Sequence, residues 1–169
     1  MNLTIRKVAA GEERALWQLY HDTIHHVNSR DYSPEQLQAW APDEIEMGKW
    51  IEKIQRIEPW VCVIDEQITG YADLQPDGLI DHFFVHHGYQ RQGVGRRLFE
   101  TIEEAAKELG LRTLHAHVSI TARPFFESRG FLVLLQQEVT IGTVVLTNFK
   151  MIKRLHPSAT DPHSRRPVD

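Results

Sequence analysis

Apolar side chains recur along the chain with two periods, one typical of helices and one typical of strands. The clearest helical repeat places them every three or four positions, at Val94, Leu98, Ile102, Ala105 and Leu109. One face of this segment is therefore apolar, which predicts an amphipathic helix over residues 94–109 that Gly110 ends. Further helices are predicted over residues 12–27, 33–40 and 43–57, the second from its Ser-Pro-Glu-Gln start.

Runs of β-branched and aromatic residues bounded by turn residues predict strands. They span residues 3–7, 60–65, 68–74, 79–85, 113–118, 132–140 and 143–153, and a short helix over 124–129 precedes the last pair. Antiparallel hairpins at both ends with a strand–helix–strand unit between them predict a mixed sheet flanked by helices, an α/β (α+β) fold. Residues 155–169 lack periodicity, so we expect a disordered tail behind one domain of residues 1–154.

The loop before the helix at 94–109 combines glycine with arginine, in the run Gln90-Arg91-Gln92-Gly93-Val94-Gly95-Arg96-Arg97. The first amides of a helix lack partners and carry the positive end of its dipole, and glycine lets an anion approach the main chain. The loop therefore suits a pyrophosphate, although an ordinary connection with surface arginines is the alternative. A Walker A loop and a dinucleotide fingerprint do not fit, because no GxxxxGK[ST] run exists and Leu98 replaces the third glycine.

A second motif follows the strand predicted at 113–118. It runs from Ser119 to Phe131, with the sequence SITARPFFESRGF. This run resembles the pattern Asn-x-x-Ala-x-x-Phe-Tyr-x-x-x-Gly-Phe of the GNAT superfamily of N-acetyltransferases. Gln90, Gly93 and Gly95 match the phosphate loop of the same superfamily, Gln/Arg-x-x-Gly-x-Gly/Ala. The two motifs in this order make the resemblance strong, and it covers roughly residues 3–153.

The resemblance implies a mostly antiparallel central sheet whose strands at 79–85 and 113–118 splay apart. It also implies acetyl-CoA as co-substrate and a primary amine as acceptor, with the pantetheine arm in the gap between these strands. Expected cofactor contacts are Phe84, Val85, Gln90, Arg91, Gln92, Gly93, Val94, Gly95, Arg96, Ser119, Phe125 and Phe126. Ser119 stands where the family often has Asn, which weakens one contact with the arm.

Acetyl transfer to an amine needs a proton acceptor, because a lysine-like amine has a pKa of about 10.4. Alternation along the strand at 79–85 places Asp81 on one face and His82 on the other. Some relatives carry a His or Glu on the former face, so Asp81 is the candidate base, directly or through water. The alternative is that Asp81 only hydrogen-bonds the nearby main chain.

Phe126 stands where many family members have a Tyr that protonates the leaving thiolate, and it has no hydroxyl. The thiolate could leave unaided, because a thiol pKa near 8.5 makes it a tolerable leaving group. Another donor could also substitute: Tyr20, Tyr32, Tyr71 or a water. The functions in competition are therefore an N-acetyltransferase, an acyl-CoA sensor that catalyses poorly, and a different nucleotide-binding domain.

Charge and composition restrict the partners and the location. A net charge of −4 gives no general attraction to nucleic acid or to an anionic membrane. No apolar run approaches the roughly 20 residues of a membrane span, so the cytoplasm is the expected location. The single cysteine, Cys62, is expected to be buried, and none of the ten histidines has a third metal ligand at a motif spacing. The expected partner is an amine substrate, and a homodimer through the last hairpin is an option that no specific residue supports.

Overall fold

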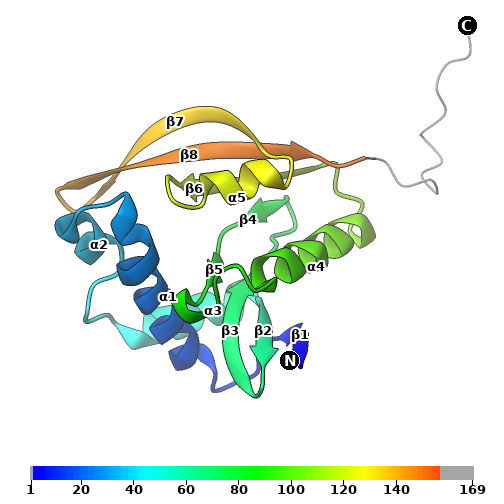
Figure 1. The fold of residues 1–169 in the computed structure, drawn as a ribbon, viewed down its shortest axis with the longest axis horizontal. Helices are drawn as coiled ribbons and strands as arrows, with labels where there is room; N and C mark the ends of the chain where they lie inside the picture. The colour runs from blue at the N-terminus through cyan, green and yellow to red at the C-terminus, as the bar shows by residue number, and fades with distance from the viewer. Residues whose placement is uncertain (1, 157–169) are drawn as a thin grey trace, which may run out of the picture.

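The computed structural model describes residues 2–156 and has the mixed α/β architecture that the sequence predicts (Figure 1). Its elements are β1 Leu3–Lys7, α1 Glu13–Val27, η1 Asn28–Arg30, α2 Pro34–Trp40, α3 Met47–Ile57, β2 Trp60–Ile64, β3 Gln67–Ala72, β4 Leu79–Ile80, β5 Phe83–Val85, η2 His87–Tyr89, α4 Val94–Glu108, β6 Thr113–Ser119, α5 Arg123–Ser128, β7 Leu132–Ile141 and β8 Val144–Arg154. Within the described residues, every helix is too short or too polar to cross a bilayer.

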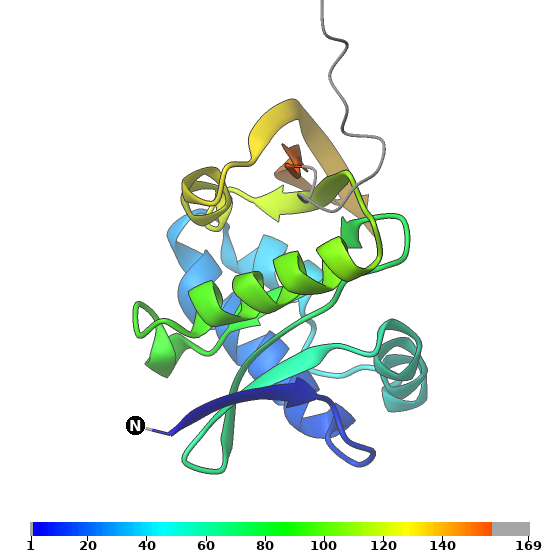
Figure 2. The same cartoon turned by 90° about the vertical axis from the view of Figure 1, so that its right-hand side faces the viewer.

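The strands form two sheets of four. The first has the order β1-β2-β3-β5 and is antiparallel throughout, and the second has the order β4-β6-β8-β7, in which β4 and β6 run parallel. β5 and β6 therefore belong to different sheets, which is the splayed strand pair that the resemblance implies. The view in Figure 2 shows the two sheets one above the other with α4 lying across the space between them.

The prediction of one continuous strand over 79–85 is wrong, because the chain changes sheets at Asp81 and His82. The cause is the buried carboxylate of Asp73. Its Oδ1 accepts hydrogen bonds from the amides of Asp81, at 2.9 Å, and His82, at 2.6 Å. These amides are bound to a side chain instead of a strand ladder, so β4 ends and β5 starts in the neighbouring sheet.

The core has two main parts, one on each face of the first sheet. Helix α4 buries Leu98, Phe99 and Ile102 against residues of both sheets, including Cys62, which is fully buried as predicted. On the opposite face, α1 and α3 bury a second cluster, made of Leu16, Leu19, Trp50, Ile54, Ile57, Val61 and Tyr71. Val94, Leu98 and Ile102 of the predicting repeat are buried here, whereas its last member, Leu109, is 59% exposed and follows the end of the helix.

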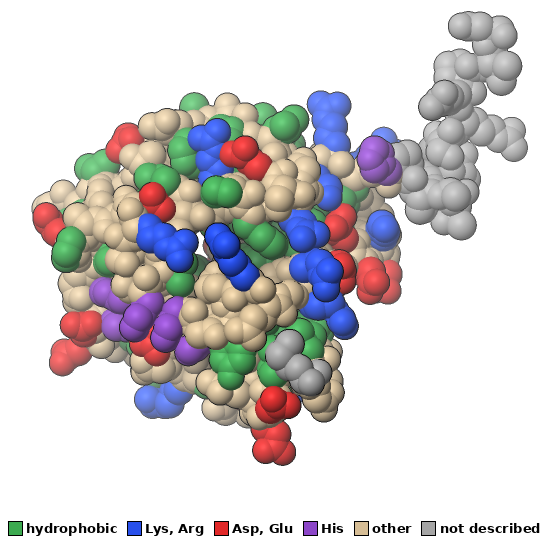
Figure 3. All heavy atoms as spheres, viewed as in Figure 1, with side chains coloured by type: hydrophobic (Ala, Val, Ile, Leu, Met, Phe, Trp, Pro, Cys, Tyr) green, Lys and Arg blue, Asp and Glu red, His purple; other side chains and the backbone are tan. Residues whose placement is uncertain are grey.

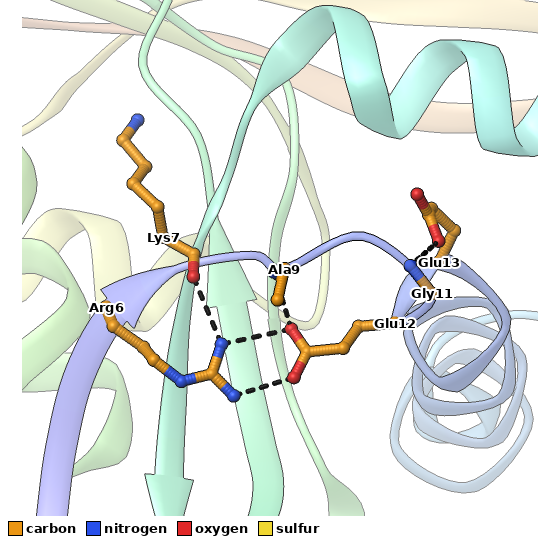
Figure 4. Close-up of polar contacts among 6 residues, drawn as sticks. All are labelled: Arg6, Lys7, Ala9, Gly11, Glu12 and Glu13. Carbon is orange, nitrogen blue, oxygen red and sulfur yellow. Dashed lines mark hydrogen bonds and ion pairs between the residues drawn. The ribbon is translucent and has the colours of Figure 1, made fainter.

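Local hydrogen bonds fix the helix starts. The predicted capping box of α2 is present, because Ser33 Oγ accepts the amide of Gln36 and the Gln36 side chain accepts the amide of Ser33. Before α1, the carboxylate of Glu12 accepts hydrogen bonds from the two terminal nitrogens of the Arg6 guanidinium, at 2.6 and 3.0 Å, and from the amide of Ala9 (Figure 4). These bonds tie the end of β1 to the start of α1.

Several elements begin or end at residues other than those predicted. Helix α3 begins at Met47 and not at residue 43, because Asp43 is held outside the helix by a contact with His21. The first hairpin turns at Asp65 and Glu66, one residue earlier than predicted, and both have positive φ.

Most of the predicted tail, residues 157–169, lies outside the described residues. Leu155 at its start is packed on the core and donates its amide to the carbonyl of Arg112, so this residue does not belong to a tail.

Candidate active site

The N-terminus of α4 presents a row of amides without helical partners. The first amide that bonds within the helix is that of Arg97, which donates to the carbonyl of Gly93 at 3.0 Å. The amides of Val94, Gly95 and Arg96 precede it, so the helix itself offers them no acceptor. Together with the positive end of the helix dipole, they make this helix start suited to an anion, and the diphosphate contact at this loop stays a prediction.

Two side-chain amides hold the loop that leads to this helix. Gln90 donates from Nε2 to the carbonyl of Val85 at 2.7 Å, and Gln92 donates to the carbonyl of Gly88 at 3.2 Å. Between them Arg91 takes a left-handed conformation, with φ of 58°. Gln90 and Gln92 therefore shape the loop, and the exposed Arg91 supplies positive charge beside it.

The two loop glycines have different physical roles. Gly93 has φ of +86°, and a Cβ there would meet only the flexible end of Arg96 at 3.7 Å, so glycine is required for its backbone conformation. Gly95 is helical, and a Cβ at this position would lie 3.3 Å from the ring of Phe125. Its missing side chain thus lets α4 approach α5, in addition to baring the main chain as the sequence analysis supposed.

Strand β5 is the open edge of the first sheet. The amide of His86, just after β5, donates to the carbonyl of Thr69 in β3 at 2.8 Å. Main-chain groups of successive strand residues point to alternate sides, so those of Phe84 face β3 and those of Val85 point away from it. Of the two predicted main-chain contacts, Val85 has the orientation that suits an added strand, although its carbonyl already accepts Gln90.

The second motif contributes two phenylalanines that pack on the core and the hydroxyl of Ser119, which accepts hydrogen bonds from within the protein. Ser119 Oγ accepts the amide of Ala122 at 3.0 Å and the side-chain amide of Asn28 at 3.3 Å. Phe126 is 4% exposed and its ring lies 5.6 Å from that of Phe83. Phe125 is half-buried and contacts the same ring at 5.3 Å. Ser119 therefore orders the turn into α5, and Phe126 serves the core.

A pocket of about 260 Å³ opens at the break between β4 and β5. Its walls come from α1, α2 and α3 on one side and from β6, β7 and β8 on the other. The lining residues are Tyr20, Tyr32, Trp40, Lys53, Asp81, His82, Phe84, His117, Ser119, Val139, Ile141, Leu146, Thr147 and Asn148. The pocket gathers three predicted site residues, Asp81, Phe84 and Ser119, whereas the loop residues 90–96, Phe125 and Phe126 lie outside its lining.

Asp81 faces a lysine in this pocket. Its carboxylate lies 3.2 Å from Lys53 Nζ, and both side chains are about one-third exposed, at 35% and 36%. The main-chain amide of Asp81 is held by Asp73, so the backbone that carries the carboxylate is fixed. Sequence reasoning missed Lys53, which reaches the pocket from the solvent side of an ordinary amphipathic helix.

His82 also lines the pocket, contrary to the alternation that placed it on the opposite face from Asp81. The strand break at these two residues turns both toward the same cavity. His82 is 6% exposed, and burial lowers its pKa to about 4, helped by the charge of Lys53. Its Nδ1 lies 2.9 Å from the hydroxyl of Tyr71. The imidazole is therefore neutral at pH 7.

The three tyrosines that could replace the missing acid lie in different environments. Tyr32 donates to the carbonyl of Thr147 at 2.6 Å and accepts the amide of Ile120, so it fastens η1 to the second sheet. Tyr71 is fully buried beneath His82. Tyr20 lines the pocket, its ring stacks on His82, and burial raises its pKa.

Two further features lie apart from this pocket. A hollow of about 470 Å³, lined by β1, the β1–α1 connection and α3, includes none of the predicted site residues. On the surface, His21, His25 and Asp43 come together at the α2–α3 connection. Histidines four residues apart share one face of a helix, so the spacing of His21 and His25 on the predicted helix is a sequence signal for this cluster.

Comparison with known proteins agrees with the geometry. A family model described as an acetyltransferase (GNAT) domain matches residues 28–153. The N-acetyltransferase YafP of Escherichia coli, itself uncharacterized, is 35% identical over 150 residues, which cover 89% of this chain and 95% of YafP. A GCN5-related N-acetyltransferase structure from Rhodopseudomonas palustris is 26% identical, with a TM-score of 0.86 over 92% of this chain and 97% of its own. The fold also matches PaiA N-acetyltransferase from Thermoplasma acidophilum, solved with coenzyme A, at a TM-score of 0.74 and 17% identity over 92% of this chain and all of that one.

Proposed function

Because the chain belongs to the GNAT superfamily of acetyltransferases, we propose that residues 1–154 move the acetyl group of acetyl-CoA to a primary amine of a small molecule or polypeptide. The observation that carries this proposal is the placement of two sites at the two ends of β5. The unpaired amides of α4 follow β5 in the chain, and the pocket with Asp81 precedes it. A cofactor arm along the edge strand β5 would connect them.

The residues present suit coenzyme A. The amides of Val94, Gly95 and Arg96 would hold the diphosphate, and Arg91 adds charge beside them. The main chain of Val85 would pair with the arm as an added strand, and Phe125 would cover it. When bound, acetyl-CoA supplies an activated acyl group as a thioester.

Asp81 is our candidate for the proton acceptor. The acceptor amine gains a bond to the acetyl carbon while the carbon–sulfur bond breaks, so the amine must lose a proton and the sulfur must gain one. Asp81 lies in the pocket with a fixed backbone, and its present partner is Lys53. An incoming ammonium group would replace Lys53 beside this carboxylate, and Asp81 would then take its proton directly or through water.

His82 is our candidate for a hydrogen-bond donor in place of the absent tyrosine acid, and the sulfur would take its proton from water, because a neutral imidazole does not release a proton near pH 7. The hydroxyl of Tyr71 is fully buried, and its hydrogen bond within the described residues is to His82 Nδ1. If the hydroxyl proton lies on this bond, the neutral ring carries its own proton on Nε2. His82 then offers an N–H to the pocket, which suits the acyl oxygen or the departing sulfur.

The test is thiol release from acetyl-CoA with a panel of primary amines. Asp81→Asn keeps the shape of the side chain and removes the acceptor, so turnover on the best amine should fall about 100-fold or more. Asp77→Asn is the matched control, because Asp77 lies four residues earlier and caps the amide of Leu79 outside the pocket. Unchanged turnover in Asp81→Asn, with coenzyme A binding intact, would remove Asp81 from this role.

An acyl-CoA sensor is the alternative function, and Phe126 is the observation that favours it. The residue has no hydroxyl and is buried among the rings of Phe83 and Phe131. A sensor predicts calorimetric binding of acetyl-CoA without thiol release on any amine of the panel. We do not propose a different nucleotide-binding domain, because the family match excludes it.

A further inference from the structure

The side chains of His21, His25 and Asp43 form a cluster that the proposed acetyl transfer does not use. One ring nitrogen of each histidine and one carboxylate oxygen of Asp43 all lie within 4.8 Å of one another. His21 Nε2 is 2.9 Å from Asp43 Oδ1, and the two imidazole rings are 4.2 Å apart between centroids. Two imidazoles and one carboxylate are a ligand set that divalent transition metals prefer.

A main-chain carbonyl selects the tautomer of the neutral His25 ring. Its Nε2 lies 2.7 Å from the carbonyl oxygen of Ala41, and a carbonyl can only accept a hydrogen bond. Nε2 therefore carries the proton, and Nδ1 of the neutral ring keeps its lone pair. A histidine that donates one nitrogen to a main-chain carbonyl and leaves the other free is the usual arrangement of a metal ligand.

The other histidine group on this side of the molecule does not share these features. Figure 3 shows histidines gathered on the face where α1 and η2 lie. Among them, the rings of His26 and His87 stack at 4.0 Å with an angle of 7° between their planes, and His86 stacks on His87 at 4.3 Å. Within the described residues, these stacked histidines do not bring three potential ligand atoms within 4.8 Å of one another, as His21, His25 and Asp43 do.

We propose that His21, His25 and Asp43 bind one divalent transition metal ion such as Zn²⁺, with water completing its coordination. Tetrahedral zinc with bonds of about 2.0–2.1 Å places its ligand atoms about 3.3 Å apart. The three side chains would therefore have to move closer together than their present separations of up to 4.8 Å. The exposed Asp43, whose side chain is 73% accessible, has room to move. Mg²⁺ and Ca²⁺ are not expected, because they prefer sites built from oxygen.

The ion would fasten the α2–α3 connection to α1. Asp43 lies in that connection, and both histidines lie on α1. The pocket residues Trp40 and Lys53 stand on either side of the connection in the chain. Metal binding would therefore stiffen one wall of the pocket, a role separate from the chemistry of transfer.

The test is calorimetric titration of untagged full-length protein with Zn²⁺, with Mg²⁺ as the comparison ion. One Zn²⁺ should bind per chain, and His25→Ala and Asp43→Asn should each weaken binding at least tenfold. His26→Ala is the matched control, because it removes the adjacent histidine of the same helix and should leave the affinity unchanged. Excess Zn²⁺ should raise the melting temperature of the wild type and of His26→Ala but not of His25→Ala.

Three outcomes would overturn the proposal: no binding of Zn²⁺, equal binding in His25→Ala, or loss of binding in His26→Ala alone. The last result would assign the ion to the stacked histidines. Since these readouts do not involve acetyl-CoA, their failure and the failure of the proposed function are distinguishable.

Discussion

Asp73 and His82 are buried neighbours at the pocket, and their pKa values are shifted in opposite directions. Burial raises the pKa of Asp73 to about 6, against hydrogen bonds from His82 and Gln75 that favour its charge. Burial also lowers the pKa of His82 to about 4. The amide of His82 donates to Asp73 at 2.6 Å, so the two groups share one local structure. At pH 7 this structure pairs a largely charged carboxylate with a neutral imidazole.

These shifts predict opposite effects of pH on stability. For Asp73 the folded pKa is raised, so the folded state holds the extra proton and stability is lost as pH rises from about 4 through 6. For His82 the folded pKa is depressed, so the unfolded state holds the extra proton and stability is lost as pH falls from about 6.5 through 4. Each pKa differs from its ordinary value by about two units, which corresponds to about 3 kcal/mol of unfolding free energy. Because the two effects have opposite signs over the same pH range, they largely cancel in the wild type.

Urea unfolding between pH 4 and pH 7 checks this prediction. Relative to the wild type, the free energy of unfolding of Asp73→Asn should rise with pH, and that of His82→Gln should fall with pH. The comparison within each variant across pH removes the constant cost of the substitution. Parallel pH profiles for the three proteins would contradict the assignment of these shifts.

Phe126→Tyr tests whether position 126 can serve as the acid. Phe126 is 4% exposed and surrounded by the rings of Phe83, Phe125 and Phe131, so an added hydroxyl is buried among apolar groups. We expect a loss of about 1–3 kcal/mol in unfolding free energy and no gain in turnover. Phe125→Tyr, at the half-buried neighbour, is the control and should cost less. A rise in turnover at unchanged stability would show that the position reaches the sulfur.

At the scale of elements, periodicity predicted the helices and most strands, because each buries one face and the pattern of apolar residues records which. The segment from Leu79 to Val85 is the exception. Its composition is that of one strand, but the carboxylate of Asp73, six residues before Leu79, captures two of its amides. The pattern of apolar residues does not show that a side chain, instead of a neighbouring strand, accepts these two amides. Consequently, the sequence predicts that Asp81 is a candidate base, but it wrongly places His82 on the face of the strand opposite Asp81, whereas both line the pocket.

The packing of α4 on α5 predicts the effect of a methyl group at Gly95. Alanine improves helix propensity by up to about 1 kcal/mol, but a Cβ here would press on the Phe125 ring at 3.3 Å. We expect Gly95→Ala to lower the unfolding free energy by about 1 kcal/mol. Gly48→Ala in α3 is the control, since a Cβ there has nothing within 4 Å, and it should be neutral or stabilising. Equal stabilisation of both variants in urea unfolding would show that Phe125 yields freely.

For the whole molecule, the loop and the helix start at α4 could be predicted from the sequence, whereas the pocket could not. The loop is local, since Gln90 to Gly95 are contiguous and helix starts have general physical properties. The pocket draws residues from three helices and from both sheets, including Lys53 and Asn148, which are 95 positions apart in the chain. Such a site depends on how two sheets diverge, and a single sequence does not record the angle between them.

That divergence gives a final prediction about the cofactor. Coenzyme A would hold α4 through its diphosphate and β5 through its arm, whereas pantetheine carries the arm alone. At a concentration about 100 times its dissociation constant, coenzyme A should stabilise the fold by about 2.7 kcal/mol, or roughly 5–10 °C in melting temperature. Pantetheine at the same concentration should give a much smaller shift, because it leaves the amides of Val94, Gly95 and Arg96 without an anion. Thermal unfolding with the two ligands separates the contributions. Equal shifts would mean that the arm provides the affinity and that the start of α4 is an ordinary helix end.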